Sequence, residues 1–155
     1  MKKMFFFLLL LAFIGLTACN DSKTGDRQSS KSKTQADSLY NDVMDGHNVG
    51  MAKMGKLTRA EQTTRRLLDS IQKLPAKARQ AAEPLRVKLD SLQKNLSYAE
   101  FAMNKWMEEF NMDSAINDMQ ERVKYLDSEK IKVSKVKEAI LGSLQAADSV
   151  LKEKS

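Results

Sequence analysis

The clearest pattern in the chain is a seven-residue repeat of apolar positions in its second half. From Leu85 to Phe110 these positions are spaced alternately by four and three residues without a break. Such spacing puts them on one face of a helix and is typical of coiled-coil packing. The pattern predicts a long helix over residues 76–111, with either a kink at Pro84 or a start at that proline. The repeat consists of Leu85, Leu89, Leu92, Leu96, Ala99, Met103, Trp106 and Phe110.

An earlier apolar face predicts a helix over residues 38–74. Asp37 and Ser38 are both residue types that cap a helix start. Pro75 ends the helix, because the residue before a proline is pushed out of the helical region. Three glycines and a capping-box pattern predict a bend or a break near Gly55. The face contains Tyr40, Met44, His47, Met51 and Met54, and is widened or continued by Val43, Gly50, Leu57, Leu67, Leu68, Ile71 and Leu74.

A third apolar face predicts a helix over residues 113–153, capped by Asp113 or Ser114. Its heptad positions are Ile116, Met119, Val123, Leu126, Lys130, Val133, Lys137, Ile140, Leu144, Ala147 and Leu151. Because two of them are lysines, with Ile131 and Val136 beside them, the apolar stripe is expected to shift there. Short turns between long helices give antiparallel neighbours. The sequence therefore predicts an all-α fold, an up-down-up bundle of three long antiparallel helices with coiled-coil packing.

The start of the chain has a different character. Lys2 and Lys3 precede an almost wholly apolar run from residue 4 to residue 15. A helix of about twelve residues spans about 18 Å, which is shorter than a bilayer core of about 30 Å. Residues 1–18 are therefore predicted to be a signal peptide rather than a membrane span.

The end of this segment, Leu16-Thr17-Ala18-Cys19, resembles the lipobox of bacterial lipoproteins. The resemblance implies diacylglycerol on the sulfur of Cys19, cleavage before Cys19, and usually a further acyl chain on its amine. An ordinary signal peptide with a free Cys19 is the alternative. Several acyl chains on one residue make anchoring effectively permanent, since one chain alone is marginal. Cys19 is the only cysteine, so lipidation would leave the mature chain without thiol chemistry.

A polar segment separates Cys19 from the helices. Residues 20–36 contain no large apolar residue and cannot bury enough surface to offset the cost of ordering. Residues 19–36 are therefore expected to be a lipidated, disordered tether with a reach of roughly 20–25 Å, and residues 37–153 the bundle. We expect the protein in the cell envelope, held by lipid, with the outer membrane preferred over the inner. Whether it faces the periplasm or the cell surface is open.

The charge balance suits several surfaces. Removing the two lysines of the signal peptide lowers the net charge from +6 to +4. That charge suits an anionic lipid surface or an acidic partner, and a helix surface of mixed sign explains it equally well. The predicted location in the cell envelope argues against nucleic acid as a partner. The third helix is locally basic, with Lys124, Lys130, Lys132, Lys135 and Lys137.

Sequence motifs of catalysis are missing. The chain has no GxGxxG, P-loop, GxSxG or HExxH motif, and its one histidine is His47. A Ser-His-Asp triad would need an oxyanion hole beside His47, and long helices do not readily supply that geometry. We therefore predict that the protein is not an enzyme and that it uses no cofactor.

One group of residues offers a different chemistry. Folding the first two predicted helices against each other brings His47 level with residues 103–110. Thioether and imidazole ligands select Cu(I) or Ag(I), so this end of the bundle is a candidate soft-metal site. Methionine is also a flexible core filler with favourable aromatic contacts, and we prefer that interpretation. The candidate ligands are His47, Met44, Met51, Met103 and Met107, with Trp106 alongside.

Three stretches of the bundle carry a family resemblance: LYNDVMDGHNVGMAKM (39–54), NKWMEEF (104–110) and YLDSEKIKVSKV (125–136). Together they resemble small helical lipoproteins of Bacteroidetes-type bacteria, commonly labelled "viral A-type inclusion protein". That family usually has a proline after the histidine where this chain has Gly50-Met51-Ala52. The resemblance covers most of residues 38–153 and implies a membrane-anchored helical protein without catalytic residues.

These observations favour a lipid-anchored, non-enzymatic interaction or structural module that binds an unknown envelope protein. The alternative is a periplasmic protein that binds Cu(I) or Ag(I). A third interpretation is an adaptor that recognises anionic lipid or glycan through the third helix. Tyr98, Phe101 and Tyr125 either form an exposed binding strip or cover the flank of the apolar face. Self-association through the long amphipathic helices is also open.

Overall fold

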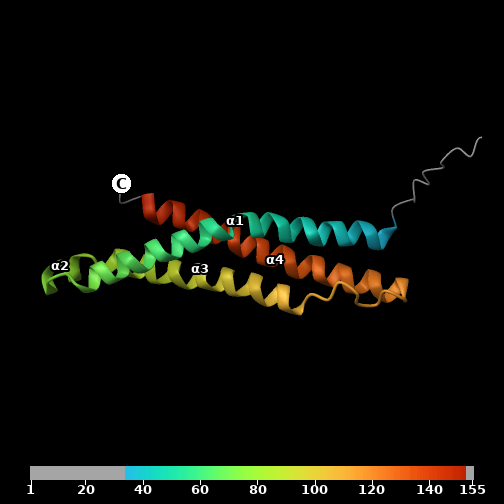
Figure 1. The fold of residues 1–155 in the computed structure, drawn as a ribbon. Helices are drawn as coiled ribbons and strands as arrows, with labels where there is room; N and C mark the ends of the chain where they lie inside the picture. The colour runs from blue at the N-terminus through green and yellow to red at the C-terminus, as the bar shows by residue number, and fades with distance from the viewer. Residues whose placement is uncertain (1–33, 153–155) are drawn as a thin grey trace, which may run out of the picture. The chain divides into compact units, whose positions relative to one another are not determined.

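The computed structural model describes residues 34–152. The predicted signal peptide, Cys19, most of the predicted tether and residue 153 lie outside this range. The described residues form helices α1 (Gln35–Gln72), α2 (Ala76–Ala81), α3 (Glu83–Glu109) and α4 (Met119–Lys152), and they include no strand. Helices α1, α3 and α4 are long and run up, down and up against one another (Figure 1). The predicted all-α bundle of three long helices is therefore confirmed.

Helix α1 begins earlier than the sequence predicted. Its N-cap is Thr34, whose hydroxyl accepts a hydrogen bond from the backbone N–H of Asp37 at 3.1 Å. The Asp37 carboxylate accepts one in return from the backbone N–H of Thr34 at 3.0 Å. Predicting the cap at Asp37 or Ser38 was wrong, because this reciprocal capping box satisfies two free N–H groups at once.

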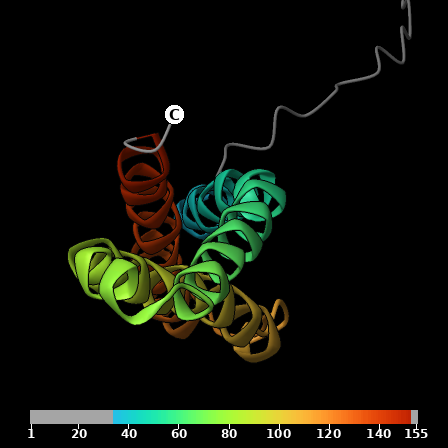
Figure 2. The same cartoon turned by 90° about the vertical axis from the view of Figure 1, so that its left-hand side faces the viewer.

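Helix α1 bends in its middle without breaking (Figures 1 and 2). The predicted capping box at Thr58 does not start a new helix, since the Thr58 hydroxyl donates to the carbonyl of Met54, one turn earlier. Thr63 and Thr64 do the same to Arg59 and Ala60. Hydroxyls that bond back to the preceding turn often bend helices. These three bonds accompany the bend, and α1 continues through it as one helix.

The two prolines shape the link between α1 and α3. Helix α1 ends at Gln72, and Pro75 precedes the short α2. Ala82 then interrupts the predicted helix over 76–111, and Pro84 lies in the first turn of α3. Proline has no N–H to donate to the carbonyl four residues earlier, and of the two predicted outcomes the structure has a new helix start next to Pro84 rather than a kink. The hairpin tip that carries α2 extends past the end of α4 (Figure 1).

The heptad face predicted for the second helix is the face that α3 buries. Its central residues are almost fully buried, and its end residues Leu85 and Phe110 are half-buried. This buried face of α3 packs against both α1 and α4, and buried residues of the three helices together form the core. The buried set is Leu89, Leu92, Leu96, Ala99, Met103 and Trp106.

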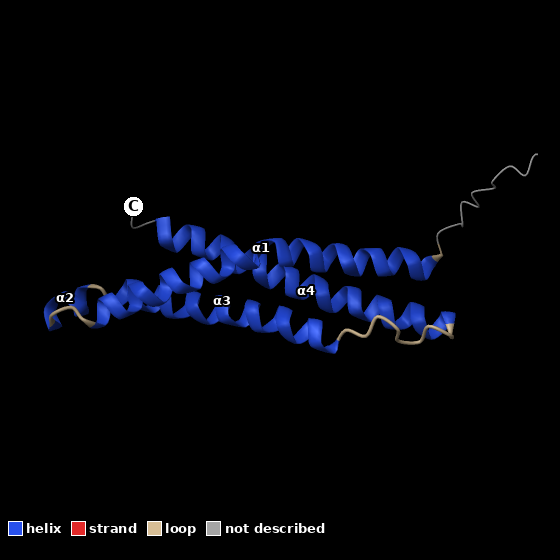
Figure 3. Cartoon of the chain, viewed as in Figure 1, coloured by secondary structure: helices blue, strands red, loops and turns tan. Residues whose placement is uncertain are grey.

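Helix α4 begins later than the sequence predicted. Residues 110–118 form a loop, drawn in tan in Figure 3. The carboxylate of Asp118 accepts hydrogen bonds from the backbone N–H groups of Gln120 and Glu121 at 3.0 and 3.1 Å. Predicting Asp113 or Ser114 as the cap was therefore wrong. The first two predicted heptad positions, Ile116 and Met119, are exposed instead of buried.

The buried face of α4 departs from the predicted one in the first half of the helix. Leu126, Val133, Ile140, Leu144 and Ala147 are buried as predicted, but Glu129 and Val136 are buried where Lys130 and Lys137 were predicted, and Ser143 is buried beside Leu144. Lys130 and Lys137 lie beside this face, where their ammonium groups stay hydrated, and Lys130 pairs with Asp42 of α1 at 2.8 Å. The stripe does shift toward Val136, whereas Ile131 is exposed.

The buried face of α1 is formed by small residues as much as by large ones. Ala36, Val43, Gly50, Leu57, Thr64 and Ile71 are buried at intervals of seven. A Cβ at Gly46 would lie only 3.0 Å from Cγ1 of Val133, and a Cβ at Gly50 would clash with the terminal methyl of Met103. The glycines therefore let α4 and the Met103 side chain approach α1 closely. None of the described helices combines the length and apolar character needed to cross a membrane.

Candidate functional site

Four rings from three helices form a row near the end of α3. The imidazole of His47 on α1 lies 5.6 Å from the indole of Trp106, centroid to centroid. Trp106 stacks on Phe110 at 4.9 Å, and Phe110 on Tyr125 of α4 at 6.2 Å. Stacked aromatic pairs at such spacings add to the stability gained from burial alone. The row therefore ties α1, α3 and α4 together beside the loop.

A buried carboxylate completes this row. Glu129 is only 3% exposed, and its oxygens accept hydrogen bonds from Trp106 Nε1 at 3.0 Å and Lys132 Nζ at 2.7 Å. A buried indole N–H needs an acceptor, and a buried carboxylate needs a cation or several donors. Each group thus supplies the partner that the other requires. Glu129 is a member of the site that the sequence analysis missed.

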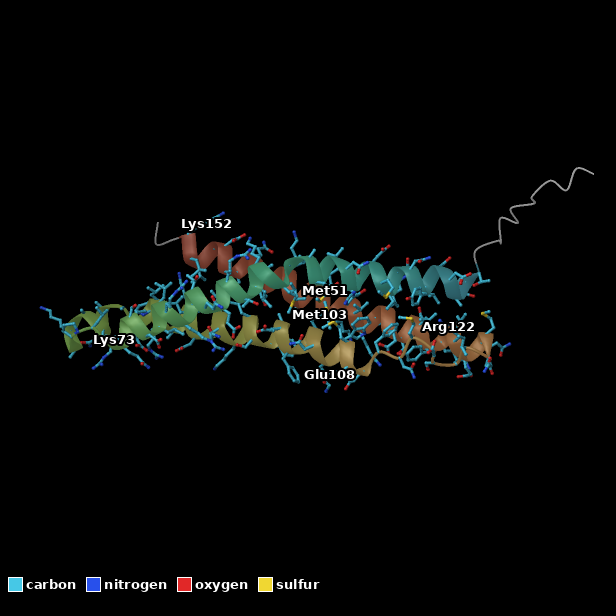
Figure 4. All side chains as sticks on the ribbon, viewed as in Figure 1. Met51, Lys73, Met103, Glu108, Arg122 and Lys152 are labelled. Carbon is cyan, nitrogen blue, oxygen red and sulfur yellow. The ribbon has the colours of Figure 1, made fainter. Side chains whose placement is uncertain are left out.

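The structure brings together some of the predicted metal ligands and separates others. Met103 is fully buried against Gly50, one helical turn from His47, and Trp106 is nearly buried. Figure 4 shows Met51 and Met103 at the same level along the bundle.

The remaining methionines vary in exposure. Met44 is half-buried, whereas Met51 and Met107 are 39% and 38% exposed. The imidazole of His47 lies with its Nδ1 3.2 Å from Oδ1 of Asn48. In the part of the chain that the structure describes, no three His, Cys, Asp or Glu side chains gather as an ion site. Binding of Cu(I) or Ag(I) by the His47 group stays a prediction.

A second polar cluster, also missed by the sequence analysis, lies between α1 and α3. Glu61 is 7% exposed, and its Oε1 accepts hydrogen bonds from Ser97 at 2.6 Å, Arg65 at 2.7 Å and Gln93 at 2.8 Å. Glu100 is hydrogen-bonded to the same carboxylate. Two carboxyl groups therefore share one partly buried site, which favours one proton between them.

The pKa values of the two carboxyl groups are shifted in opposite directions. Burial raises the pKa of Glu100, and its hydrogen bond to Glu61 and the negative charge of Glu61 raise it further. Burial also acts to raise the pKa of Glu61, but the hydrogen bonds from Ser97 and Arg65 outweigh it and lower that pKa. Of the two carboxyls, Glu100 is therefore the one with the higher pKa. The sequence gives little sign of this cluster, because Glu61 is not one of the apolar residues that mark the predicted face.

The basic residues of α4 are largely engaged by carboxylates. Lys124 pairs with Glu121 at 2.7 Å, Lys130 with Asp42 at 2.8 Å and Lys132 with Glu129 at 2.7 Å. These hydrogen bonds raise the pKa of all three lysines. The basic stretch is therefore partly neutralised by its own helix and by α1, which lowers its attraction for an anionic surface.

An open groove runs between α3 and α4 on the side of Tyr98 and Phe101. These two rings are 62% and 59% exposed, which makes them the most exposed large apolar side chains of α3. The ammonium of Lys105 lies 6.0 Å from the centroid of Phe101. The predicted binding strip is thus divided, since Tyr125 belongs to the ring row instead. The groove is lined by Tyr98, Phe101, Lys105, Glu109, Lys132 and Val136.

Comparisons with protein-family models, with curated proteins and with solved structures give no match to this chain. The resemblance to small helical lipoproteins stays a prediction from the sequence.

Proposed function

We propose that this chain is a lipoprotein of the bacterial cell envelope whose bundle acts as a non-enzymatic interaction or structural module. The observation that carries the proposal is the order of features at the start of the sequence. A basic pair, a short apolar run and the box Leu16-Thr17-Ala18-Cys19 follow one another at the spacing of a lipoprotein signal. The lipid on Cys19 is the link to the membrane.

The bundle supports a role in binding rather than in chemistry. Its buried glutamates Glu129 and Glu61 accept hydrogen bonds from neighbouring side chains. The hollows between α1 and α4 and between α3 and α4 are open grooves. The groove beside Tyr98 and Phe101 offers exposed aromatic rings next to charged side chains. Aromatic residues are enriched where proteins bind one another. We assign the partner's contact to this groove.

The anchor is tested by the full-length protein and its Cys19→Ser variant, expressed in a bacterium that processes lipoproteins. The native protein is expected in the membrane fraction, with a mature chain that starts at Cys19 and carries the mass of its acyl groups. Cys19→Ser is expected to leave the membrane fraction, because the acceptor for the lipid is gone. A native chain with a free Cys19 thiol in the soluble fraction would refute the proposal.

A further inference from the structure

Three large apolar side chains are exposed together where α3 turns into α4. Met112, Ile116 and Met119 are 54%, 59% and 55% exposed. Single exposed apolar residues are common on protein surfaces. Three of them within eight positions at one tip of a bundle form a concentrated apolar feature, which is typical of a surface that contacts a partner or a membrane.

Hydrogen bonds with side chains of α4 fix the backbone of the loop. Arg122 donates through Nη1 to the carbonyls of Met112 at 3.1 Å and Ser114 at 2.9 Å. The backbone N–H of Asn111 donates to the hydroxyl of Tyr125 at 2.7 Å. Ala115 has a φ of 53°, a left-handed conformation that is unfavourable for a residue with a Cβ. The loop therefore has a defined conformation that is fixed by hydrogen bonds.

The same end of the bundle receives the chain that comes from Cys19. Gln35, the first residue of α1, lines one groove together with Met119 and Val123 of α4. Figure 3 shows the loop and the start of α1 at the same end. Thr34 lies fifteen positions after Cys19, and the disordered tether that the sequence predicts there would reach roughly 20 Å. A lipid on Cys19 thus keeps the loop close to the bilayer at high effective concentration.

We propose that this loop docks on the bilayer that holds Cys19, with Met112, Ile116 and Met119 inserted at the level of the lipid headgroups. The inference rests on the proposed lipid anchor. It fixes which end of the bundle touches the membrane and leaves the α2 tip pointing away from it.

The chemistry of the contact is apolar rather than electrostatic. Asp113 and Asp118 are acidic members of the loop, the guanidinium of Arg122 is engaged by carbonyls, and Lys124 is paired with Glu121. An excess of positive charge is therefore missing from the described part of this tip. Docking is expected to be equally strong on neutral and on anionic lipid, and to be insensitive to salt.

The test uses the full-length lipidated protein in vesicles of phosphatidylcholine. An Ile116→Cys variant is labelled with a fluorophore that brightens in apolar surroundings; acylation of Cys19 leaves residue 116 as the only reactive thiol. The matched control is Leu74→Cys, an exposed apolar residue at the opposite end. We expect the probe at 116 to brighten and to be quenched by acyl chains that carry a quencher, and the probe at 74 to do neither.

A probe at Met112 repeats the measurement at a second position, in case the label at 116 disturbs the loop. Two probes that stay unquenched while the protein remains on the vesicles would overturn the docking alone. A native protein that takes the label on Cys19 and washes off the vesicles would overturn the anchor and, with it, the docking. The two failures are therefore distinguishable.

Discussion

At the scale of single residues, the bundle depends on polar side chains that are buried in pairs. Glu129 and Trp106 satisfy each other, and Glu61 collects three donors around one oxygen. Removing the Glu129 carboxylate would leave the buried indole N–H of Trp106 without its acceptor, which costs about 1–3 kcal/mol. The apolar pattern of the sequence does not mark either glutamate as buried, although Glu129 and Glu61 are 3% and 7% exposed. Their burial depends on which residues of a neighbouring helix face them. The periodicity of a single helix carries no information about those neighbours.

The shared site of Glu61 and Glu100 makes the stability of the bundle depend on pH. The pKa of Glu100 is raised in the folded state, so protonation of Glu100 favours folding. This contribution is complete below the unfolded pKa of glutamate, about 4.3, and is lost as pH rises through the folded pKa. Glu100→Gln keeps a neutral donor to Glu61 at every pH. The variant is therefore expected to melt at a higher temperature than the native protein at pH 7, with a smaller difference near pH 4.

Glu108→Gln is the matched control for this experiment. Glu108 is exposed on the same helix (Figure 4), and its replacement changes the net charge by the same amount. Thermal unfolding of both variants at pH 4 and pH 7 separates a local effect from a general one. Equal shifts in the two variants would show that net charge, rather than the shared proton, determines the difference.

At the scale of elements, the fold could be predicted where large apolar residues mark the buried face. Helix α3 follows its aliphatic heptads closely. The buried face of helix α1 is harder to predict, because Gly46 and Thr64 occupy buried positions that a search for large apolar residues does not find. The start of helix α4 is hard to predict, because Ile116 fits the apolar repeat but belongs to the loop. The existence and order of the long helices follow from the apolar periodicity. Their ends depend on capping hydrogen bonds, and their register depends on where small residues let two helices approach closely.

Two glycines test the role of close approach between elements. Gly142 on α4 is exposed, and an added Cβ there meets nothing within 4 Å. Gly142→Ala is therefore expected to stabilise the protein by about 1 kcal/mol through helix propensity alone. Gly46→Ala is expected to destabilise it, because its Cβ would press on Val133, a buried β-branched residue with little rotamer freedom.

The two alanine variants are compared by urea unfolding at one temperature. Each carries the same chemical change within a helix, so the difference between them reports the environment of the glycine. If both variants were stabilised equally, α4 would not approach α1 at Gly46 as described.

At the scale of the whole molecule, the two ends and the sides of the bundle differ in what they present. One end has the apolar loop and the start of α1, the other has α2, and the groove beside Tyr98 lies between them along α3 and α4. The candidate soft-metal site was predicted only from the positions of its residues along the bundle axis. Helix length determines these positions, so the sequence could place His47 beside Trp106. The exposure of Met51 and Met107 depends instead on how each helix is rotated about its own axis.

The groove is expected to be covered by a partner in the cell. A photo-activated cross-linking residue at Tyr98 should give discrete adducts in living cells, because the exposed rings would be the partner's contact. The same residue at Val49, an exposed apolar position on α1, is the matched control. Adducts at Val49 but not at Tyr98 would place the partner elsewhere, and adducts of twice the chain mass at Tyr98 would identify a second copy as the partner.

The length of α1 has a mechanical consequence. A helix of 38 residues is about 57 Å long, and it runs without interruption from the capping box at Thr34 to the hairpin that carries α2. If a partner holds the groove beside Tyr98 while lipid holds Cys19, tension enters α1 at Thr34 and passes to α3 and α4 through the contacts between the helices. The contacts of α1 with α3 and α4 are then loaded in shear, all at once, instead of being peeled apart one after another. Such a bundle resists being pulled from the membrane side better than its modest core would suggest.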